Sequence, residues 1–588
     1  MRILGISCLS HDAGIAVIKD GVPEIVIEEE RLNREKRTLE FPAQSLFEAF
    51  DRRGLTLGDV DAITTPWRIH DMRVQMRWML LRGFPRSFNL LRQNALGVIP
   101  RYFVFLDFVL RSGLRKHFDN ARVPNIVQCG HHNSHAASFY VSPFDKATVL
   151  VMDGYGDNCS TSVYEGAGDK LRFVRKNQLT DSLGILYTFV SQYLGFASFG
   201  DEGKVMGLAA YGEPTYVERF RDLVHLRDDG EYALNRDYFC HHLYGQNRPF
   251  TRKFQEVFGP PNPFRGELTQ RHRDLAFALQ AVTEETILHI VRAICKQHDA
   301  RKLCLVGGVA MNCVANSKIL EHTDVEEIWV PPCASDTGVP LGSALWHHHQ
   351  TLRNPRSFEL THPFYGVGYS DEEIVAALKA AGLTYKRLEE GELLATVAGD
   401  LADGKIIGWF QDRFEMGARA LGNRSILADP RRAEMKDIIN ARVKHREPFR
   451  PFAPAVLIEH ASEYFEIDQA DPYMTIAPRV RKEKAKLIPA AVHVDGTGRF
   501  QTVERTANPR YYGVIEAFKE RTGVPVLLNT SFNRQEPIVA RPEEAISCFL
   551  RTDMDGLVLG NYYSTDRNPA AVKQAHNAFE KAAAPDVS

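Results

Sequence analysis

The stretch ATVLVMDGYGD, residues 147–157, decides the fold of this chain. Its first part, residues 147–152, is apolar and rich in branched side chains, which predicts a buried β-strand. The strand ends abruptly at Asp153-Gly154-Tyr155-Gly156-Asp157, where the glycines favour a tight turn. Small polar residues and the segment 161–164 follow, which predicts a returning strand. The local pattern is therefore strand, acidic glycine turn, strand.

The start of the chain repeats this pattern. Apolar segments at 2–7 and 13–19 are followed by the tight-turn dipeptide Asp20-Gly21 and a further strand at 24–29. The repetition suggests a duplicated fold.

A third glycine turn, Gly307-Gly308, follows the buried-type strand 302–306 and precedes a helix predicted over 310–320. Backbone N–H groups at such turns bind phosphate or ribose without steric interference, although any single glycine pair is equally compatible with a simple turn. Alternating strands and helices indicate α/β architecture. The order of the three turns fits an actin-like nucleotide cleft between two halves.

Length and composition describe an ordinary globular protein with several domains. A chain of 588 residues is too long for one hydrophobic core, and 44% of its residues are apolar and 25% charged. The polar, proline-containing stretch 352–363 is the best boundary, and we expect domains at residues 1–358 and 359–588. The net charge of −2 argues against a nucleic-acid partner, because nucleic-acid binders usually carry a basic stripe.

The nine cysteines include no C-x-x-C pair, which excludes a zinc-finger pattern and suits a reducing compartment. The N-terminus lacks a signal-peptide pattern, and no apolar run reaches the roughly 18 residues of a membrane span. We therefore expect a cytoplasmic protein without a transmembrane segment. Its oligomeric state cannot be derived from these patterns.

The segment His131-His132-Asn133-Ser134-His135 is a candidate metal site. On a helix, His131 and His135 project from one face and can share a metal ion, although a bare pair at this spacing is also common as packing. Asp153 and Asp336 each follow a predicted strand at a glycine turn. Two imidazoles and two carboxylates suit Fe(II), Mn(II) or Zn(II). The four residues together predict a metal centre.

Cations gather at glycine and proline turns of the C-terminal half. Together with nearby amide and hydroxyl groups they suit a polyanionic ligand such as an acyl phosphate with a triphosphate, although each cation alone is typical of a solvated surface. The group comprises Arg419, Arg424, Lys444, Arg446, Arg450, Arg499, Asn529 and Ser531.

The stretch 66–118 is rich in arginine and aromatic residues. Ten basic residues from Arg68 to Lys116 accompany two acids, Asp71 and Asp107. One interpretation is a helical insertion packed on the domain with solvated arginines. The other is a surface for an acidic or lipid-like partner.

Over essentially its whole length the chain resembles the O-carbamoyltransferases of antibiotic and nodulation-factor biosynthesis (tobramycin carbamoyltransferase-like). The motifs that carry the resemblance are SHDA (10–13), EEER (28–31), HHNSHA (131–136), DGYGD (153–157), GKVMGLA (203–209), GGVAMN (307–312), SDTG (335–338), RALGNRSI (419–426), HVDGT (493–497) and LNTSFN (528–533).

The resemblance implies an actin-like (ASKHA) duplicated N-terminal domain and an α/β, YrdC-like C-terminal domain. The C-terminal domain is expected to bind carbamoyl phosphate and ATP with Mg(II), and to form carbamate and then carbamoyl adenylate and pyrophosphate. By likeness, Lys444, Arg450, Arg499, Asn529 and Ser531 hold carbamoyl phosphate. Arg419 and Arg424 are the candidates for contacts with ATP.

In the N-terminal domain the resemblance implies that His131, His135, Asp153 and Asp336 ligate iron. Lys36, Gly184, Gly308 and Asn312 match positions that contact the adenylate. His11 matches the general base for the acceptor hydroxyl, a role that an ordinary pKa near neutrality would suit. The implied activity is carbamoyl transfer to a hydroxyl of a small-molecule natural product or sugar.

Three other functions fit the sequence less well. A tRNA threonylcarbamoyl-type modification enzyme is disfavoured by the near-neutral charge and by the carbamoyl-phosphate residues. A hydrogenase-maturation carbamoyltransferase would carry an acylphosphatase domain and cysteine zinc motifs, which this sequence lacks. An actin-like ATP-binding scaffold would explain the glycine turns but not the four converging metal-type ligands.

Overall fold

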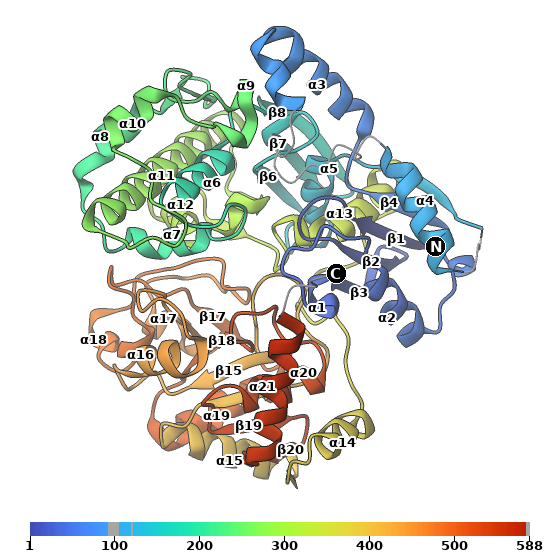
Figure 1. Cartoon of the computed structure of the whole chain (residues 1–588), viewed down its shortest axis with the longest axis vertical. Coiled ribbons are helices and arrows are strands. Elements are labelled where there is room, and N and C mark those ends of the chain that lie inside the picture. Colours follow the sequence, from blue (N-terminus) through green and yellow to red (C-terminus); the bar gives the residue numbers. More distant parts are fainter. Residues whose placement is uncertain (92–104, 119–121, 584–588) are drawn as a thin grey trace. The chain divides into compact units, whose positions relative to one another are not determined.

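The computed structural model describes residues 1–91, 105–118 and 122–583, and divides the chain into two compact units (Figure 1). The first unit contains Met1–Glu30 and Arg37–Leu360, and the second contains Arg31–Lys36 and Thr361–Ser588. The division falls within the stretch 352–363, which forms no helix or strand. The short segment Arg31–Lys36 belongs to the second unit although the chain around it belongs to the first.

The first unit contains two sheets of five strands each, and a small two-stranded sheet of β9 (Val224–Leu226) and β10 (Tyr232–Leu234). The first sheet has the order β3 (Val22–Glu28), β2 (Gly14–Lys19), β1 (Arg2–Ser7), β4 (Ala62–Thr65), β5 (Asn125–Gln128). The second has the order β8 (Lys170–Gln178), β7 (Cys159–Ala167), β6 (Lys146–Met152), β11 (Lys302–Val306), β12 (Glu327–Trp329).

Strand directions match as well as strand order. In each sheet the first three strands along the chain pair antiparallel. The fourth strand pairs in parallel with the first, and the fifth pairs in parallel with the fourth. The central strand β6 is apolar and buried except for Lys146, because it has a parallel neighbour on one side. The edge strand β8 carries exposed lysine and arginine side chains. The repeated topology confirms the predicted duplicated actin-like fold.

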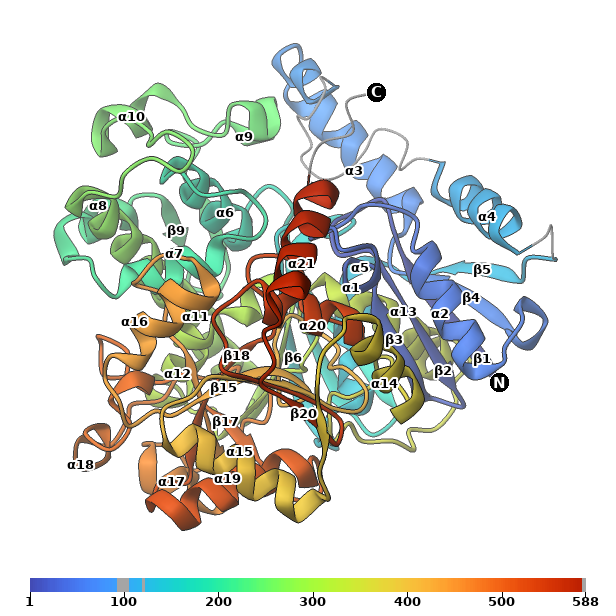
Figure 2. The same ribbon diagram turned by 60° about the horizontal axis from the view of Figure 1, so that its bottom comes forward.

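Helices cover both sheets, and α2 contacts β2 and β3 (Figure 2). The helices are α1 (Glu30–Asn33), α2 (Ala43–Arg53), α3 (Ile69–Arg82), α4 (Leu106–His117), α5 (His131–Ala136), α6 (Leu183–Tyr193), α7 (Glu202–Ala209), α8 (Val217–Arg221), α9 (His241–Tyr244), α10 (Arg252–Phe258), α11 (Gln270–His298), α12 (Cys313–His322) and α13 (Val339–Leu345). Part of the predicted arginine-rich stretch, residues 92–104, lies outside the described residues.

Helix α13 connects the first sheet to α5 at close range. It contacts β1, β2 and α5. A Cβ atom on Gly5 of β1 would lie 1.9 Å from the carbonyl oxygen of Pro340, and one on Gly342 would lie 1.9 Å from that of Ser134. Only glycine permits these two contacts, which place the start of α13 directly beside α5.

The second unit contains one eight-stranded sheet. Its order is β13 (Lys386–Arg387), β20 (Tyr562–Ser564), β19 (Gly556–Leu559), β14 (Ile407–Phe410), β15 (Arg424–Ala428), β18 (Val526–Ser531), β16 (Ala453–Leu457), β17 (Gln501–Val503). Its helices are α14 (Asp371–Ala380), α15 (Glu390–Ala402), α16 (Met435–Ile439), α17 (Ala461–Tyr464), α18 (Lys482–Ala485), α19 (Pro509–Thr522), α20 (Pro542–Leu550) and α21 (Pro569–Ala583). This unit is α/β, as predicted.

Within the described residues, no helix combines the length and the apolar character that crossing a membrane requires.

Candidate functional site

Both candidate histidines lie on the short helix α5, directly after β5. Gly130 precedes the helix with φ 89°, a left-handed conformation that favours glycine. His131 and His135 stand one turn apart, and their Nε2 atoms are 3.3 Å from each other. Both side chains are buried, His131 completely. The local sequence thus brings two imidazoles to one point inside the first unit.

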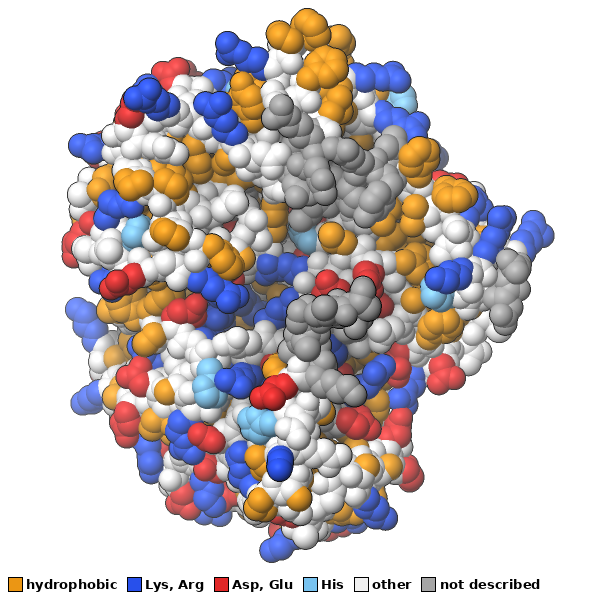
Figure 3. Space-filling model, in the orientation of Figure 1, with side chains coloured by type: hydrophobic (Ala, Val, Ile, Leu, Met, Phe, Trp, Pro, Cys, Tyr) orange, Lys and Arg blue, Asp and Glu red, His pale blue; other side chains and the backbone are white. Residues whose placement is uncertain are grey.

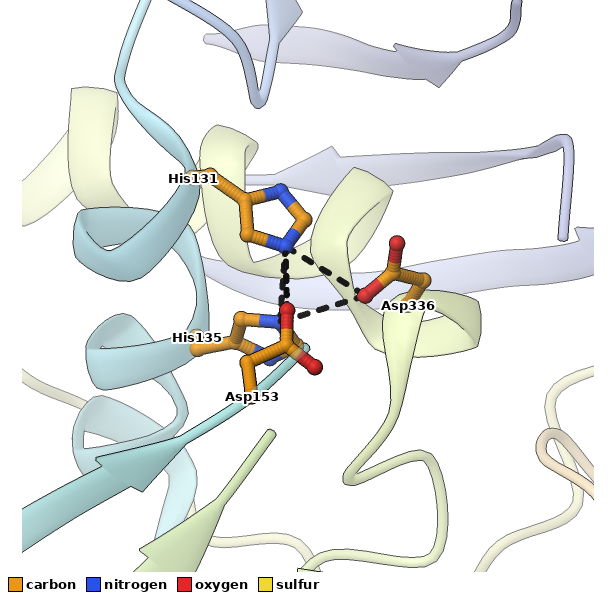
Figure 4. A group of neighbouring side chains, drawn as sticks. All are labelled: His131, His135, Asp153 and Asp336. Atoms are coloured by element: carbon orange, nitrogen blue, oxygen red, sulfur yellow. Dashed lines mark hydrogen bonds and ion pairs between the residues drawn. The ribbon is translucent and has the colours of Figure 1, made fainter. Parts of the chain in front are cut away.

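The two candidate aspartates reach the same point from the second sheet (Figure 4). Asp153 follows β6, and its Oδ2 lies 2.9 Å from Nε2 of His131 and 3.8 Å from Nε2 of His135. Asp336 begins the 3₁₀ turn Asp336–Gly338 before α13, and its Oδ1 lies 3.3 Å and 3.4 Å from the same two atoms. The structure therefore brings all four predicted metal ligands together.

The donor set fits a metal ion. One ligand atom from each residue lies within 4.8 Å of all the others. Ligands bonded at about 2.0–2.1 Å to Zn(II) or Fe(II) lie roughly 3–3.4 Å apart, close to most of the distances here. Oδ1 of Asp336 is buried and faces the two imidazole nitrogens at ion-pair distance without a well-formed hydrogen bond, which suits a ligand atom.

The histidines and aspartates of this cluster shift one another's pKa values. Burial lowers the pKa of His131, but the negative charges of Asp336 and Asp153 outweigh it and raise the pKa to about 10. Burial raises the pKa of Asp336, but the imidazolium charges of His131 and His11 hold it well below its usual range. A bound cation would replace these protons, because metal ligation requires neutral imidazole.

His11 stands at the edge of the cluster, in the turn between β1 and β2. Its Nε2 lies 3.7 Å from Oδ2 of Asp336, and its Nδ1 lies 3.0 Å from Oδ2 of Asp12. The expected pKa near neutrality does not match the structure. Burial lowers the pKa of His11, but the charges of Asp336 and Asp12 raise it to about 9. Neutralising Asp336 would therefore bring the pKa down again.

Three of the predicted adenylate contacts lie in this unit, and two of them surround Asp153. The N–H of Gly308 donates to Oδ1 of Asp153 at 3.0 Å. Gly184 lies against the peptide that follows Asp153, where a Cβ atom would be 2.9 Å from N of Gly154. Asn312 caps α12 and exchanges hydrogen bonds with Gln280. Lys36 belongs to the other unit.

Two residues to which the sequence assigned no role support the cluster of four candidate metal ligands (the metal-type cluster). Oδ2 of Asp157 accepts the N–H of His131 at 2.6 Å, and Oδ1 accepts the N–H of Arg68 at 2.8 Å. The indole of Trp67 stacks on the His131 ring at 4.1 Å between centroids. The sequence could have pointed to Asp157 as the second acid of the DGYGD turn. No nearby sequence pattern indicates that Trp67 lies at the site.

Cations of the second unit form a distinct group. Burial lowers the pKa of Arg446, and the neighbouring positive charges of Arg450 and Arg499 lower it further, to about 9. Burial and the charges of Arg446 and Arg450 hold the pKa of Lys444 well below its usual range. Mutual repulsion of this kind is relieved by an anion, which makes the group a candidate anion site.

Lys444 also connects to the predicted strand-end residues. Its ammonium donates to the carbonyl and hydroxyl oxygens of Ser531 and to Oδ1 of Asn533 at 2.7 Å. The side-chain amide of Asn529 donates to the carbonyl of Ala420 and to Gln501. The arrangement brings Lys444 and Ser531 into contact, while Asn529 lies deeper in the sheet.

Arg424 differs from the other cations because it is completely buried. Its guanidinium donates to backbone carbonyls of Gln411, Asp412 and Asn423, and stacks 3.5 Å from the Phe410 ring centre. These are the contacts of an arginine that holds loops together. Arg419 is partly exposed. Contacts of either residue with ATP stay a prediction.

Family models cover most of the chain. A model described as "Carbamoyltransferase N-terminus" matches residues 2–345, and one described as "Carbamoyltransferase C-terminus" matches residues 398–565. The chain therefore belongs to the carbamoyltransferase family. Its resemblance to the O-carbamoyltransferases of antibiotic and nodulation-factor biosynthesis is confirmed, and the chain is a transferase.

Relatives align along most of their length. The chain is 38% identical over 559 residues to nodulation protein NolNO of Sinorhizobium fredii, covering 94% of this chain and 78% of that protein. It is 32% identical over 399 residues to 3'-hydroxymethylcephem-O-carbamoyltransferase of Amycolatopsis lactamdurans, covering 66% and 69%. A Synechocystis protein, sll1178, is 39% identical over 601 residues, covering 95% and 96%.

Proposed function

We propose that the chain is an ATP-dependent O-carbamoyltransferase that works in two steps. In the second unit, water hydrolyses carbamoyl phosphate to carbamate and phosphate, and a carbamate oxygen then attacks the α-phosphate of ATP, which forms carbamoyl adenylate and releases pyrophosphate. In the first unit, an acceptor hydroxyl attacks the carbamoyl carbon and AMP leaves. The observation that carries the proposal is the buried convergence of two histidines and two aspartates in a member of the carbamoyltransferase family.

The chemistry of the first unit follows from its residues. His131, His135, Asp153 and Asp336 would hold Fe(II), with Mn(II) or Zn(II) as alternatives. When bound, the cation would supply Lewis acidity toward the carbonyl of the carbamoyl group. If the Nδ1–H of His11 is donated to Asp12, Nε2 keeps its lone pair and can accept the proton of the acceptor hydroxyl.

The cation group of the second unit supports the first step. Lys444, Arg446, Arg450 and Arg499 concentrate positive charge where a phosphate ester or anhydride would relieve it. ATP would enter with Mg(II). Carbamate decays readily in water, so keeping it away from bulk water until it reacts with ATP would be advantageous.

A single substitution separates the two steps. His131→Ala should abolish carbamoyl transfer and leave pyrophosphate release, dependent on ATP and carbamoyl phosphate, within about twofold, because the mutated residue lies in the other unit. Pyrophosphate is measured by a coupled assay, and transfer by mass spectrometry across a panel of hydroxylated acceptors.

The control is His241→Ala, which removes another buried histidine of the first unit, one that contacts the carbonyl of Thr180. It should retain both activities. Absence of pyrophosphate release in the wild-type chain would refute the adenylate step. Loss of that release in a folded His131→Ala variant would refute the assignment of the steps to separate units.

A further inference from the structure

The outer part of α3 and the following turn expose a cluster of large apolar side chains that the transfer reaction does not use. Leu81 is 71% exposed, Phe84 69%, Phe88 55% and Trp78 54%. They lie within the short range from α3 (Ile69–Arg82) through the 3₁₀ turn Arg86–Leu91. Side chains of this size are seldom left in water as a group, so the cluster points to a binding surface.

The exposed side chains form a stripe on α3. Val74, Trp78 and Leu81 follow at i, i+4 and i+7, which places them on one helix face. With 3.6 residues per turn, Arg77 falls on one side of this stripe and Arg82 on the other. The guanidinium of Arg82 lies 5.3 Å from the ring centre of Trp78. The surface therefore has an apolar centre with cationic edges.

Basic side chains are the only fully exposed charges of this segment. Arg73, Arg77, Arg82 and Arg86 are exposed, and between residues 69 and 91 the sequence contains one acid, Asp71. Arg248, on the loop after α9, is exposed too, and α9 packs against the 3₁₀ turn. Figure 3 shows apolar side chains at the outer end of α3 with basic side chains beside them. The patch is complementary to a negatively charged surface.

From this arrangement we propose that the segment Ile69–Leu91 binds the surface of an anionic phospholipid bilayer, with Trp78, Leu81 and Phe84 entering the headgroup boundary. Interfacial helices combine Trp, Phe and Leu on one face with arginines at its edges. Protein interfaces are also enriched in aromatic residues and arginine, so a protein partner is the alternative occupant that the vesicle experiments below distinguish from a bilayer. The bilayer surface satisfies both kinds of side chain.

Tryptophan fluorescence tests the proposal on the unmodified chain. Trp78 is the most exposed of the five tryptophans, because Trp67, Trp329 and Trp409 are buried and Trp346 is half-buried. Vesicles of phosphatidylcholine mixed with phosphatidylglycerol should bind the chain and, when the lipids are brominated, quench its emission. Vesicles of phosphatidylcholine alone should bind at least about tenfold more weakly. Trp78→Phe should remove most of the quenching.

Paired variants identify the surface. Leu81→Asp with Phe84→Asp should weaken co-sedimentation with the anionic vesicles about tenfold or more. Arg77→Glu with Arg86→Glu should do the same and abolish the preference for anionic lipid. The control is Phe264→Asp, which removes a phenylalanine that is 65% exposed and also lies beside an arginine, Arg265, and it should bind as wild type.

Three results would overturn the proposal. The first is no binding of the wild-type chain to anionic vesicles. The second is binding without quenching by brominated lipid, which would mean that Trp78 stays in water. The third is an equal loss of binding in Phe264→Asp. If the aspartate variants fail to fold, the quenching of the wild-type chain still decides between these outcomes.

Discussion

At the scale of single residues, Asp157 links the sequence motif to the geometry of the metal-type cluster. Its carboxylate accepts the backbone N–H of His131 and so fixes the first turn of the helix that carries both histidines. It also accepts the N–H of Arg68, directly after the tryptophan that stacks on the His131 ring. We therefore expect Asp157 to position the ligands without touching the metal.

Asp157→Asn should lower metal affinity by about 10- to 100-fold, the usual effect of losing a supporting hydrogen bond behind a ligand. The amide keeps the size of the side chain but presents an N–H toward one of the two backbone donors. Isothermal titration with Zn(II), or with Fe(II) under anaerobic conditions, measures the change.

The matched control is Asp181→Asn. Asp181 is likewise buried and accepts a backbone N–H, that of Leu234 at 2.9 Å. The Asp181→Asn variant should lower the stability of the fold but leave metal affinity unchanged. Equal losses of affinity in both variants would mean that Asp157 acts only through general stability.

Residue chemistry also shows what sequence patterns could predict. Sequence alone could predict His131, His135 and Asp153 as ligands, because helix spacing and a strand ending at a turn are local features. Arg424 and Arg446 look alike in sequence, yet one is sealed among carbonyls and an aromatic ring while the other sits in a repelling group of cations. Burial of that kind arises from contacts distant in sequence, so no local pattern reveals it. The raised pKa of His11 partly has the same origin, since the largest single contribution to the rise comes from Asp336, which is distant in sequence.

At the scale of elements, one ion pair joins the loop after β18 to the end of α20. Glu536 and Arg551 lie 2.8 Å apart, and both side chains are nearly buried. Burial raises the pKa of Glu536, but the charge of Arg551, together with backbone hydrogen bonds and the hydrogen bond from Arg551, outweighs it and lowers the pKa to about 2. Arg551 also lies 3.8 Å from the ring centre of Phe579 on α21. The pair thus stabilises the attachment of two helices.

This ion pair predicts a pH-dependent stability. Because the folded pKa of Glu536 is depressed, its stabilising effect is fully present above the unfolded value near 4.5 and is lost as the pH falls toward 2. Glu536→Gln should cost about 2–3 kcal/mol at pH 7, and the difference from wild type should shrink below about pH 4.5. Thermal unfolding followed across this range measures it.

Glu463→Gln serves as the comparison. Glu463 pairs with Lys484 at an exposed site, where the contribution should stay below about 1 kcal/mol at every pH. A constant difference between Glu536→Gln and wild type from pH 7 to pH 3 would contradict the assigned ion pair.

The duplication was predictable at this scale from two segments of strand, glycine turn and strand, but their turns are not equivalent. Asp20-Gly21 joins the second and third strands of the first sheet, whereas residues 153–157 join the first and second strands of the other. The membership of Arg31–Lys36 in the second unit was not predictable. Arg31 donates to the carbonyls of Glu415 and Gly417, and Arg34 to that of Ile538. These partners lie hundreds of residues away, and no periodicity in the sequence records them.

At the scale of the whole molecule, the candidate metal ligands connect the two halves of the first unit. The histidines follow the last strand of one sheet, and Asp153 follows the first strand of the other. A cation held by all four should therefore stabilise that unit as a whole, and it should leave the second unit unchanged because no ligand lies there.

Metal removal tests this difference between the units. Restoring metal at about 100 times Kd should stabilise the first unit by about 2.7 kcal/mol. Trp409 is the one tryptophan in the second unit, so fluorine NMR of 5-fluorotryptophan protein follows the unfolding of both units separately. His135→Ala should abolish the effect. An equal stabilisation sensed at Trp409 would show that the units unfold as one.

The passage of Arg31–Lys36 through the second unit bears on how the chain can be divided. A gene fragment for residues 361–588 alone would encode a unit that lacks Arg31, a side chain only 1% exposed that lies 2.7 Å from the carbonyl of Gly417. A protease cut between residues 352 and 363 would leave Arg31–Lys36 bound within the second unit. The N-terminal and C-terminal products should therefore elute together in gel filtration. Split-gene expression should consequently yield usable protein from co-expressed halves, and a poorly folding product from the C-terminal piece by itself.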